Sequence, residues 1–368
     1  MSYKKTKYYL GTNSPNGYIT KFNELIESNK YHCYILKGMP GIESRAVLEH
    51  ISRRYQHRES GIEYYYCCNS EDKLDAILME DSKIIVVDGT MPHIFETSIP
   101  GIFHSEISLV DCYDTSALMA HKDDIVNCFL ESRCAEKRCQ RFLSACSILA
   151  NDTYTIASEN VNLSKAQGFI NRLCRKILPR GKRRSGKEHY RQLSAITPHG
   201  YCNLLDDNLE EYDTIYQLNC DNFVIPDLLL KGIAALTLKS GLDIIISDNP
   251  IFGTNIKEHI LVPGIKTAFV TAHFMNGINY DEAIQINCKR FYDMTELAKK
   301  RKRLSFNKKA INQLYDEAVK SLASSQAHYD RLSEYYSPII NDKKLDEKLM
   351  WLNEQIEHII MRADSMGT

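Results

Sequence analysis

The stretch "CYILKGMPGIESRAVLEH" contains the residues of this sequence whose types and spacing come closest to a defined chemistry. An apolar segment is followed by Gly38, Pro40 and Gly41 and then by a helical pattern. A phosphate-binding loop has this layout, in the form GxxxxGK[ST]. Its glycines let backbone N–H groups surround the phosphates, its lysine neutralises their charge, and its hydroxyl binds magnesium. The chemistry at issue is therefore the binding of a nucleoside triphosphate with magnesium.

The last three positions of this pattern carry Glu43, Ser44 and Arg45 in place of glycine, lysine and a hydroxyl residue. Losing the lysine removes a charge-assisted contact worth about 1.5–3 kcal/mol, and Glu43 puts a carboxylate where an anion would bind. Arg45 is a cation, but it offers no acceptor to a metal ion. The sequence therefore predicts a degenerate loop that opposes a triphosphate. The candidate ligand-binding residues of this loop are Gly38, Met39, Pro40, Gly41, Ile42, Glu43, Ser44 and Arg45.

Asp88 and His93 are the candidate residues of a second motif, "KIIVVDGTMPH". An aspartate that ends an apolar strand stands where nucleotide-hydrolysing α/β proteins hold magnesium. Asp88 is thus the candidate magnesium ligand and, with His93, a candidate catalytic residue. Each residue has a structural alternative. Asp88 followed by Gly89 is also typical of a turn at a strand end, and an isolated histidine such as His93 is often part of the packing.

An offset of 183 residues relates the two halves of the sequence. Tyr18 in "TNSPNGYI" corresponds to Tyr201 in "AITPHGYC", and "KIIVVDGTMPH" corresponds to "KTAFVTAHFMN". One constant offset across turns, strands and helices indicates an internal duplication of roughly residues 7–180 and 190–363. The second copy retains less of the candidate chemistry.

Two differences make the second copy the poorer candidate for a phosphate site. Its stretch "YQLNCDNFVIPDLLLKGI" has no glycine-rich turn and carries Pro226. Thr271 stands at the position of Asp88. Of the two strand-end positions, only the one at Asp88 is therefore acidic.

The hydrophobic pattern predicts the elements that position these residues. In each copy, short continuous apolar segments such as "CYILK", "IEYYYCC" and "KIIVVD" alternate with helical patterns. Such segments are typical of a parallel sheet covered on both faces, which predicts the α/β fold class. Later in each copy, apolar residues recur every three or four positions, which predicts an antiparallel helical hairpin at about 115–178 and about 295–363. These stripes favour packing between helices, with a partner-binding coiled coil as the alternative.

The length of 368 residues is about twice that of a typical domain, so we expect two domains. The first repeat is expected at residues 1–180, a linker at 181–189 and the second repeat at 190–368. The segment around the linker, "PRGKRRSGKEHYRQ", is basic and has no hydrophobic periodicity. Its "GKRRSGKE" matches GxxxxGK, but no strand precedes it, so an exposed linker is favoured. The alternative is a patch for phosphate or nucleic acid formed by Lys182, Arg183 and Arg184.

Composition narrows the classes of function. The formal net charge of -1 gives no basic excess of the kind that nucleic-acid binders carry. The N-terminal "MSYKKTKYYLG" lacks the apolar run of a signal peptide, and the longest apolar stretches are too short to span a bilayer. We therefore expect a cytoplasmic protein that does not bind a membrane. The twelve cysteines include no CxxC pair, which predicts reduced thiols, and the adjacent Cys67 and Cys68 are poorly spaced for one metal ion.

Together these motifs resemble a family of bacterial proteins with two tandem P-loop NTPase domains in each chain. The family's first loop, "ILKGGPGTGKST", is similar to "ILKGMPGIESRA". Its segments "HCSSDPDSLDGVI", "IVDGTAPH" and "FASAITPNG" are similar to "CCNSEDKLDAIL", "VVDGTMPH" and "RQLSAITPHG". The resemblance covers essentially the whole chain.

The resemblance implies two tandem P-loop NTPase-like α/β domains with mainly parallel sheets, and ATP with magnesium as cofactors. The family carries glycine, lysine and serine in both loops, whereas this chain has other residues at those positions in both copies. Lys37 is no replacement, because the family has a lysine there as well as in the loop. We therefore expect a pseudo-ATPase with a degenerate Walker A loop that acts as a binding or scaffold module, with an unknown protein partner at the helical hairpins.

The alternative is an ATP-binding protein or ATPase with an atypical site in the first repeat. Such a site would use Arg45, Asp88 and His93, or a lysine donated by the other copy.

Overall fold

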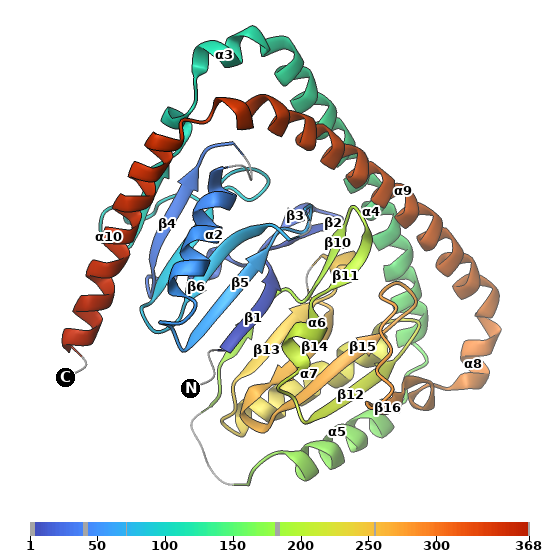
Figure 1. Cartoon of the computed structure of the whole chain (residues 1–368). Helices are drawn as coiled ribbons and strands as arrows, with labels where there is room; N and C mark the ends of the chain where they lie inside the picture. Colours follow the sequence, from blue (N-terminus) through green and yellow to red (C-terminus); the bar gives the residue numbers. More distant parts are fainter. Residues whose placement is uncertain (1–3, 40–42, 71, 181–184, 254, 367–368) are drawn as a thin grey trace. The chain divides into compact units, whose positions relative to one another are not determined.

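The structure is a computed structural model that describes residues 4–39, 43–70, 72–180, 185–253 and 255–366 (Figure 1). The chain forms two compact units. The first unit comprises residues 1–11, 18–137 and 321–368, and the second comprises residues 12–17 and 138–320. Each unit contains a six-stranded sheet with helices, which confirms the predicted α/β class. The units exchange segments along the chain, whereas the expected boundaries near residues 180 and 190 were consecutive.

The sheet of the first unit is mixed and mostly parallel. Its strands lie in the order β1 (Lys4–Tyr9), β5 (Gly61–Tyr66), β6 (Leu74–Met79), β7 (Ile84–Asp88), β4 (His32–Lys37) and β8 (His104–Ser108). β6 is antiparallel to both of its neighbours, and the other neighbouring strands are parallel. The residues of β6 and β7 are all buried, as expected for apolar central strands with both faces covered.

The sheet of the second unit has the same topology. Its strands lie in the order β9 (Glu188–Tyr190), β13 (Ile244–Asp248), β14 (Lys257–Val262), β15 (Thr267–Ala272), β12 (Thr214–Asn219) and β16 (Ile284–Asn287). β14 is antiparallel to both neighbours, as β6 is in the first unit. The strand pairs β5 and β13, β6 and β14, and β7 and β15 each begin 183 residues apart. A duplication would produce this agreement, and the duplication itself stays a prediction.

Each sheet is accompanied by a short hairpin at the turn-rich segments noted in the sequence. The hairpins are formed by β2 (Thr12–Ser14) with β3 (Gly17–Ile19) and by β10 (Ser194–Thr197) with β11 (Gly200–Asn203). Gly17 and Gly200 have φ of 90° and 116°, a backbone conformation that glycine adopts without steric cost. Each glycine is followed by a tyrosine, Tyr18 or Tyr201, which the turn places at the start of its second strand.

Helices form where the apolar stripes predicted them, but they pack differently from the expected hairpins. The long helices are α4 (Lys122–Ser158), α5 (Leu163–Ile177), α9 (Arg301–Tyr336) and α10 (Asp342–Met366), and the short helices α3 (Thr115–Ala120) and α8 (Met294–Lys299) precede α4 and α9. α5 packs into the core of the second unit, beside α7 (Val224–Lys239). α10 packs into the core of the first unit, beside α2 (Glu43–Tyr55). The last helix of each half of the sequence therefore belongs to the core of the other half.

The remaining elements are short. They are α1 (Asn23–Ile26), α6 (Leu205–Leu209) and the 3-10 turns Val110–Cys112, Pro250–Phe252, Pro263–Ile265, Cys288–Phe291 and Ser337–Ile339. Within the predicted linker, residues 181–184 lie outside the described residues. The part that follows is not a free linker, because β9 begins at Glu188 and pairs with β13. Among the helices described, none is long and apolar enough to cross a membrane.

Candidate functional site

Gly38 and Glu43 lie at the carboxyl end of β4 and the start of α2, the position at which a phosphate loop is expected. In α/β proteins the carboxyl ends of parallel strands form the edge at which ligands bind. Gly38 and Met39 follow β4, and Glu43 is the first residue of α2. Pro40, Gly41 and Ile42 lie outside the described residues, so the loop is characterised by the residues on either side of them.

The carboxylate of Glu43 lies against the backbone of its own loop. The hydroxyl of Tyr113 donates to Glu43 Oε2 at 2.7 Å and accepts from the Met39 N–H at 2.6 Å. A Cβ built on Gly38 would lie 3.2 Å from Glu43 Oε2 and 3.1 Å from the Tyr113 hydroxyl, so the carboxylate reaches the glycine of the loop. Glu43 is 1% exposed. A side-chain anion therefore lies at the helix N-terminus, where backbone N–H groups favour negative charge.

Burial raises the pKa of Glu43, and hydrogen bonds from Tyr113 and from the backbone of Glu43 and Met39 act in the opposite direction. Burial also raises the pKa of Tyr113, as does the neighbouring Glu43 carboxylate, so this hydroxyl keeps its proton and can donate. The pair is therefore held together by a hydrogen bond.

Ser44 and Arg45, the other two substituted positions, are both engaged within the first unit. Ser44 Oγ donates to Asp88 Oδ2 at 2.5 Å. Arg45 Nε donates to Glu49 Oε1 at 2.7 Å, and its side chain is 50% exposed. The position that would hold the phosphate-binding lysine thus contributes a hydroxyl that binds the strand-end aspartate.

Lys37, the nearest lysine before the loop, is also occupied. Its ammonium donates to the carbonyl oxygens of Gly89 at 3.0 Å and Phe95 at 2.8 Å. It therefore ties β4 to the segment that follows β7 and is directed at backbone carbonyls there.

Asp88 combines the two interpretations that the sequence left open. Its Oδ1 accepts from the Thr90 N–H at 2.9 Å and from the Thr90 hydroxyl at 2.5 Å, as expected of a residue that fixes a turn at a strand end. It is also 2% exposed and lies beside two further titratable groups, Asp75 and His93. Asp88 is thus a turn residue whose carboxylate faces a polar cluster.

We call Asp75, Asp88 and His93 the acid-histidine cluster. One potential ligand atom from each residue lies within 4.8 Å of the other two, and Asp75 Oδ2 is 3.8 Å from His93 Nε2. Asp75 comes from β6, Asp88 ends β7, and His93 follows in the next loop. The cluster borders a cavity of about 160 Å³ that is also lined by Arg45 and Lys73.

Three atoms of this cluster are buried without a hydrogen-bond partner among the described residues: Asp75 Oδ2 and both ring nitrogens of His93. The same is true of the hydroxyl of Tyr18, whose ring lies beside His93. Asp75 is 2% exposed and His93 is 4% exposed. Burial raises the pKa of Asp75, while the facing His93 lowers it. Buried polar groups usually have a partner, so each orphaned group requires an explanation.

Asp75 was not among the residues singled out from the sequence. It lies in "KLDAIL", an acidic residue within a mostly apolar run, and its counterpart at the 183-residue offset is Glu258, which directly precedes "HILV" in the strand "KEHILV". An acid at the same position of two corresponding buried strands is the signal that could have identified it.

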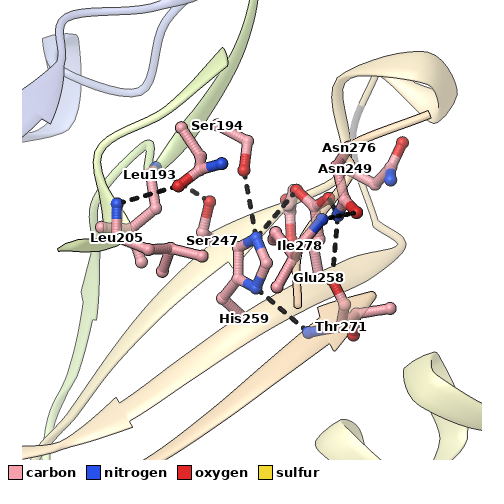
Figure 2. A network of polar contacts seen from close by, with 12 residues as sticks. Leu193, Ser194, Leu205, Ser247, Asn249, Glu258, His259, Thr271, Asn276 and Ile278 are labelled. Carbon is pink, nitrogen blue, oxygen red and sulfur yellow. Dashed lines mark hydrogen bonds and ion pairs between the residues drawn. The ribbon is translucent and has the colours of Figure 1, made fainter. Parts of the chain in front are cut away.

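The corresponding region of the second unit is a network of polar contacts (Figure 2), which we call the closed network because the ring nitrogens of its histidines all have partners. Glu258 Oε2 and the Thr271 hydroxyl have no hydrogen-bond partner among the described residues. Glu258 Oε1 accepts from Tyr201 Oη at 2.7 Å, from His273 Nε2 at 2.8 Å and from Asn276 Nδ2 at 3.3 Å. Thr271, the counterpart of Asp88, binds Asn276 through its carbonyl oxygen, which accepts from Asn276 Nδ2 at 2.9 Å. Every one of these side chains is buried or nearly so.

His259 completes this network. Its Nδ1 accepts from the Thr271 N–H at 3.3 Å, so its proton is assigned to Nε2. Nε2 lies 3.0 Å from Ser194 Oγ and 3.4 Å from Glu258 Oε2. Burial alone would raise the pKa of Glu258, but His259 and His273 outweigh it and hold this pKa well below its usual range.

The second unit also has a cavity beside the loop that corresponds to the degenerate phosphate loop. This cavity of about 570 Å³ borders Cys220, Asn222 and Phe223. Phe223 has φ of 62° directly before α7, a left-handed conformation that residues other than glycine seldom adopt. At the position of Ser44 stands Asp227, whose carboxylate accepts from the Lys257 N–H at 2.9 Å. A second carboxylate is thus tied to backbone near a helix start.

No family model, curated protein or solved structure matches this chain. The membership expected from the motifs therefore stays a proposal.

Proposed function

We propose that this chain is a degenerate tandem P-loop NTPase-like protein, a pseudo-ATPase that acts as a binding or scaffold module. The observation that carries the proposal is the position of the Glu43 carboxylate, which reaches Gly38 and is tied to Met39 through Tyr113. A triphosphate at this loop would meet a buried carboxylate, and like charges at such a site repel each other strongly.

The other groups that ATP with magnesium would need do not fit either. The lysine position is Ser44, whose hydroxyl is bound to Asp88, and Lys37 is held by two carbonyl oxygens. Arg45 pairs with Glu49 on the surface of α2. These residues therefore supply no positive charge to a phosphate group.

A nucleotide titration tests the proposal. Isothermal calorimetry of the native protein with ATP and magnesium should show no micromolar binding. The triple reversion Glu43→Gly, Ser44→Lys and Arg45→Ser should gain binding, because it restores the glycine, the cation and the hydroxyl together. Glu43→Gln is the matched control, since it removes the charge without restoring the lysine, and it should stay inactive. Micromolar binding by the native protein that Asp88→Asn abolishes would refute the proposal.

A second candidate function is an ATP-binding protein or ATPase with an atypical site in the first repeat. It is favoured by the acid-histidine cluster, because Arg45 borders the same cavity as Asp88 and His93. The two functions differ in steady-state hydrolysis. If the native protein releases phosphate from ATP and the triple reversion adds little, the enzyme is the correct assignment.

A protein partner at the long helices belongs to the same proposal. It is supported by large apolar side chains that are exposed on α4, including Val126, Leu130 and Ile148. The nucleic-acid alternative depends on Lys182, Arg183 and Arg184, which lie outside the described residues. Neutralising these three residues should leave binding to nucleic acid unchanged if the linker has no such role.

A further inference from the structure

We propose that Asp75, Asp88 and His93 bind a divalent transition-metal ion, with Zn²⁺ the best match, and that they do so without a nucleotide. The three donors come from β6, β7 and the loop after β7 and meet at the carboxyl edge of the sheet. The proposal does not depend on whether the degenerate loop binds ATP.

The distances are those of a site that needs small side-chain adjustments. Zn²⁺ binds nitrogen and oxygen ligands at about 2.0–2.2 Å in a tetrahedral arrangement, which places the ligand atoms about 3.3 Å apart. Asp75 Oδ2 and His93 Nε2 are 3.8 Å apart, and the three ligand atoms lie within 4.8 Å of one another. Closing the cluster around an ion therefore requires rotations of side chains and no rearrangement of the sheet.

The orphaned groups are a second and independent observation. Asp75 Oδ2 and both ring nitrogens of His93 are buried without a hydrogen-bond partner among the described residues. An unsatisfied buried polar group costs about 1–3 kcal/mol, and three of them meet at one cavity. A cation that accepts electron pairs from a carboxylate and an imidazole removes this cost at all the donor atoms it contacts.

The second unit shows which protein donors can face an acid at this position. At the position of Asp75, Glu258 Oε1 accepts hydrogen bonds from His273 and Asn276, while Glu258 Oε2 has no hydrogen-bond partner among the described residues and lies 3.4 Å from His259 Nε2. In the first unit, Thr90 stands where His273 would be, and its hydroxyl is bonded to Asp88. Of the three donors to Glu258 Oε1, His273 and Asn276 are therefore replaced near Asp75, and the third, Tyr201, corresponds to Tyr18, whose hydroxyl is buried without a hydrogen-bond partner among the described residues.

Asp88 can coordinate an ion while it keeps its present contacts. Its oxygens accept from Ser44 and Thr90, and each carboxylate oxygen has two acceptor lone pairs. Such hydrogen bonds to a ligating carboxylate fix its orientation and are usual around metal sites. Ser44 and Thr90 are thus positioning residues for the proposed ligand.

The donor set selects the class of metal. Imidazole favours Zn²⁺ and its neighbours in the first transition series, whereas Mg²⁺ prefers six oxygen ligands in a near-octahedral arrangement. Two carboxylates and one neutral imidazole balance the charge of a divalent ion. Three protein ligands beside a cavity leave one position open for water or another small ligand, as at exchangeable zinc sites.

Metal titration of the full chain tests the proposal. Protein stripped with a chelator should bind one equivalent of Zn²⁺ by isothermal calorimetry, and one equivalent of Co²⁺ should give the visible absorption of a tetrahedral ion. His93→Ala and Asp75→Asn should each weaken Zn²⁺ binding by at least about 100-fold. Circular dichroism of the stripped variants should match the native protein, which separates ligand loss from misfolding.

The second unit provides the matched control. Glu258→Gln lies at the position that corresponds to Asp75 and should leave Zn²⁺ affinity unchanged. The proposal is overturned if the native protein takes up no Zn²⁺, if His93→Ala and Asp75→Asn bind as tightly as the native protein, or if Mg²⁺ binds as tightly as Zn²⁺. Because nucleotide is omitted throughout, these outcomes are independent of the ATP titration.

Discussion

The two units place different polar groups at the same edge of the same sheet topology. In the second unit, Glu258 is bonded by Tyr201, His273 and Asn276. In the first unit, Asp75 stands at the corresponding position, and its Oδ2 has no hydrogen-bond partner among the described residues. Glu258 Oε2 also lacks a hydrogen-bond partner there, so the two regions differ chiefly in their histidines: the ring nitrogens of His259 and His273 have partners, whereas both ring nitrogens of His93 have none among the described residues.

Three residue differences account for this contrast. Asp75 is one methylene shorter than Glu258, Thr90 replaces His273 as the donor, and His93 replaces Asn276. Since an imidazole and a carboxylate that both lack hydrogen-bond donors suit a cation, the first unit is the one in which we expect a ligand. In the second unit, the acid at the same position, Glu258, is hydrogen-bonded by protein side chains and has a structural role.

Removing the carboxylate of the closed network should have the largest effect on stability. Glu258→Ala leaves His273 and Tyr201 buried without their acceptor, and breaking a buried ionic or hydrogen-bonded pair costs about 3–5 kcal/mol. Urea unfolding followed by far-UV circular dichroism measures the loss. Fluorescence of Trp351, the single tryptophan, reports on the first unit alone.

Asp75→Ala is the matched variant in the first unit. It removes a carboxylate whose Oδ2 has no hydrogen-bond partner among the described residues and which interacts with the Cys67 thiol, so in metal-free protein we expect a smaller loss, about 1 kcal/mol. Equal losses in the free energy of unfolding for Glu258→Ala and Asp75→Ala would contradict the difference between the two regions.

Transplanting the closed network into the first unit should have an intermediate effect. The triple variant Asp75→Glu, Thr90→His and His93→Asn introduces the donors and the longer acid of the second unit. By satisfying groups that are now orphaned, it should stabilise metal-free protein by about 1–3 kcal/mol and abolish Zn²⁺ binding. Urea midpoints and calorimetry measure the two effects, and a variant that retains Zn²⁺ would contradict the assignment of His93.

The sequence predicts the scaffold of both regions better than their contacts. Hydrophobic pattern and spacing predict the strands β4 and β7 and the position of Asp88 at a strand end. The strand β6 was not identified from the sequence as a separate strand, and Asp75 was therefore missed. An acidic residue within an apolar run does not indicate which groups it will contact in the fold.

The sequence pattern could not predict how the long helices pack, for a related reason. A stripe of apolar residues predicts that a helix face is buried but does not identify the surface that covers it. Leu352 and Ile356 of α10 are buried in the core of the first unit, and Ile170 of α5 is buried in the core of the second. A hairpin within each half and an exchange between halves therefore give the same stripe.

Acidification should reveal the smallest of the expected differences. The pKa of folded Glu258 lies below its usual value because His259 and His273 outweigh the effect of burial. The stabilising contribution of this group is therefore complete above the unfolded pKa, about 4.3, and is lost as the pH falls toward the folded pKa. Below pH 4.3, the free energy of unfolding should fall by up to about 1.4 kcal/mol per pH unit on this account.

Glu258→Gln isolates that contribution, because it keeps the shape of the side chain and removes its titration. The variant should be less stable than the native protein at neutral pH, and the difference should shrink between about pH 4.3 and lower values. Urea unfolding at several acidic pH values measures it. If the difference is constant with pH, Glu258 does not titrate with a depressed pKa, and the histidines hold the network together by hydrogen bonds without a charge on the acid.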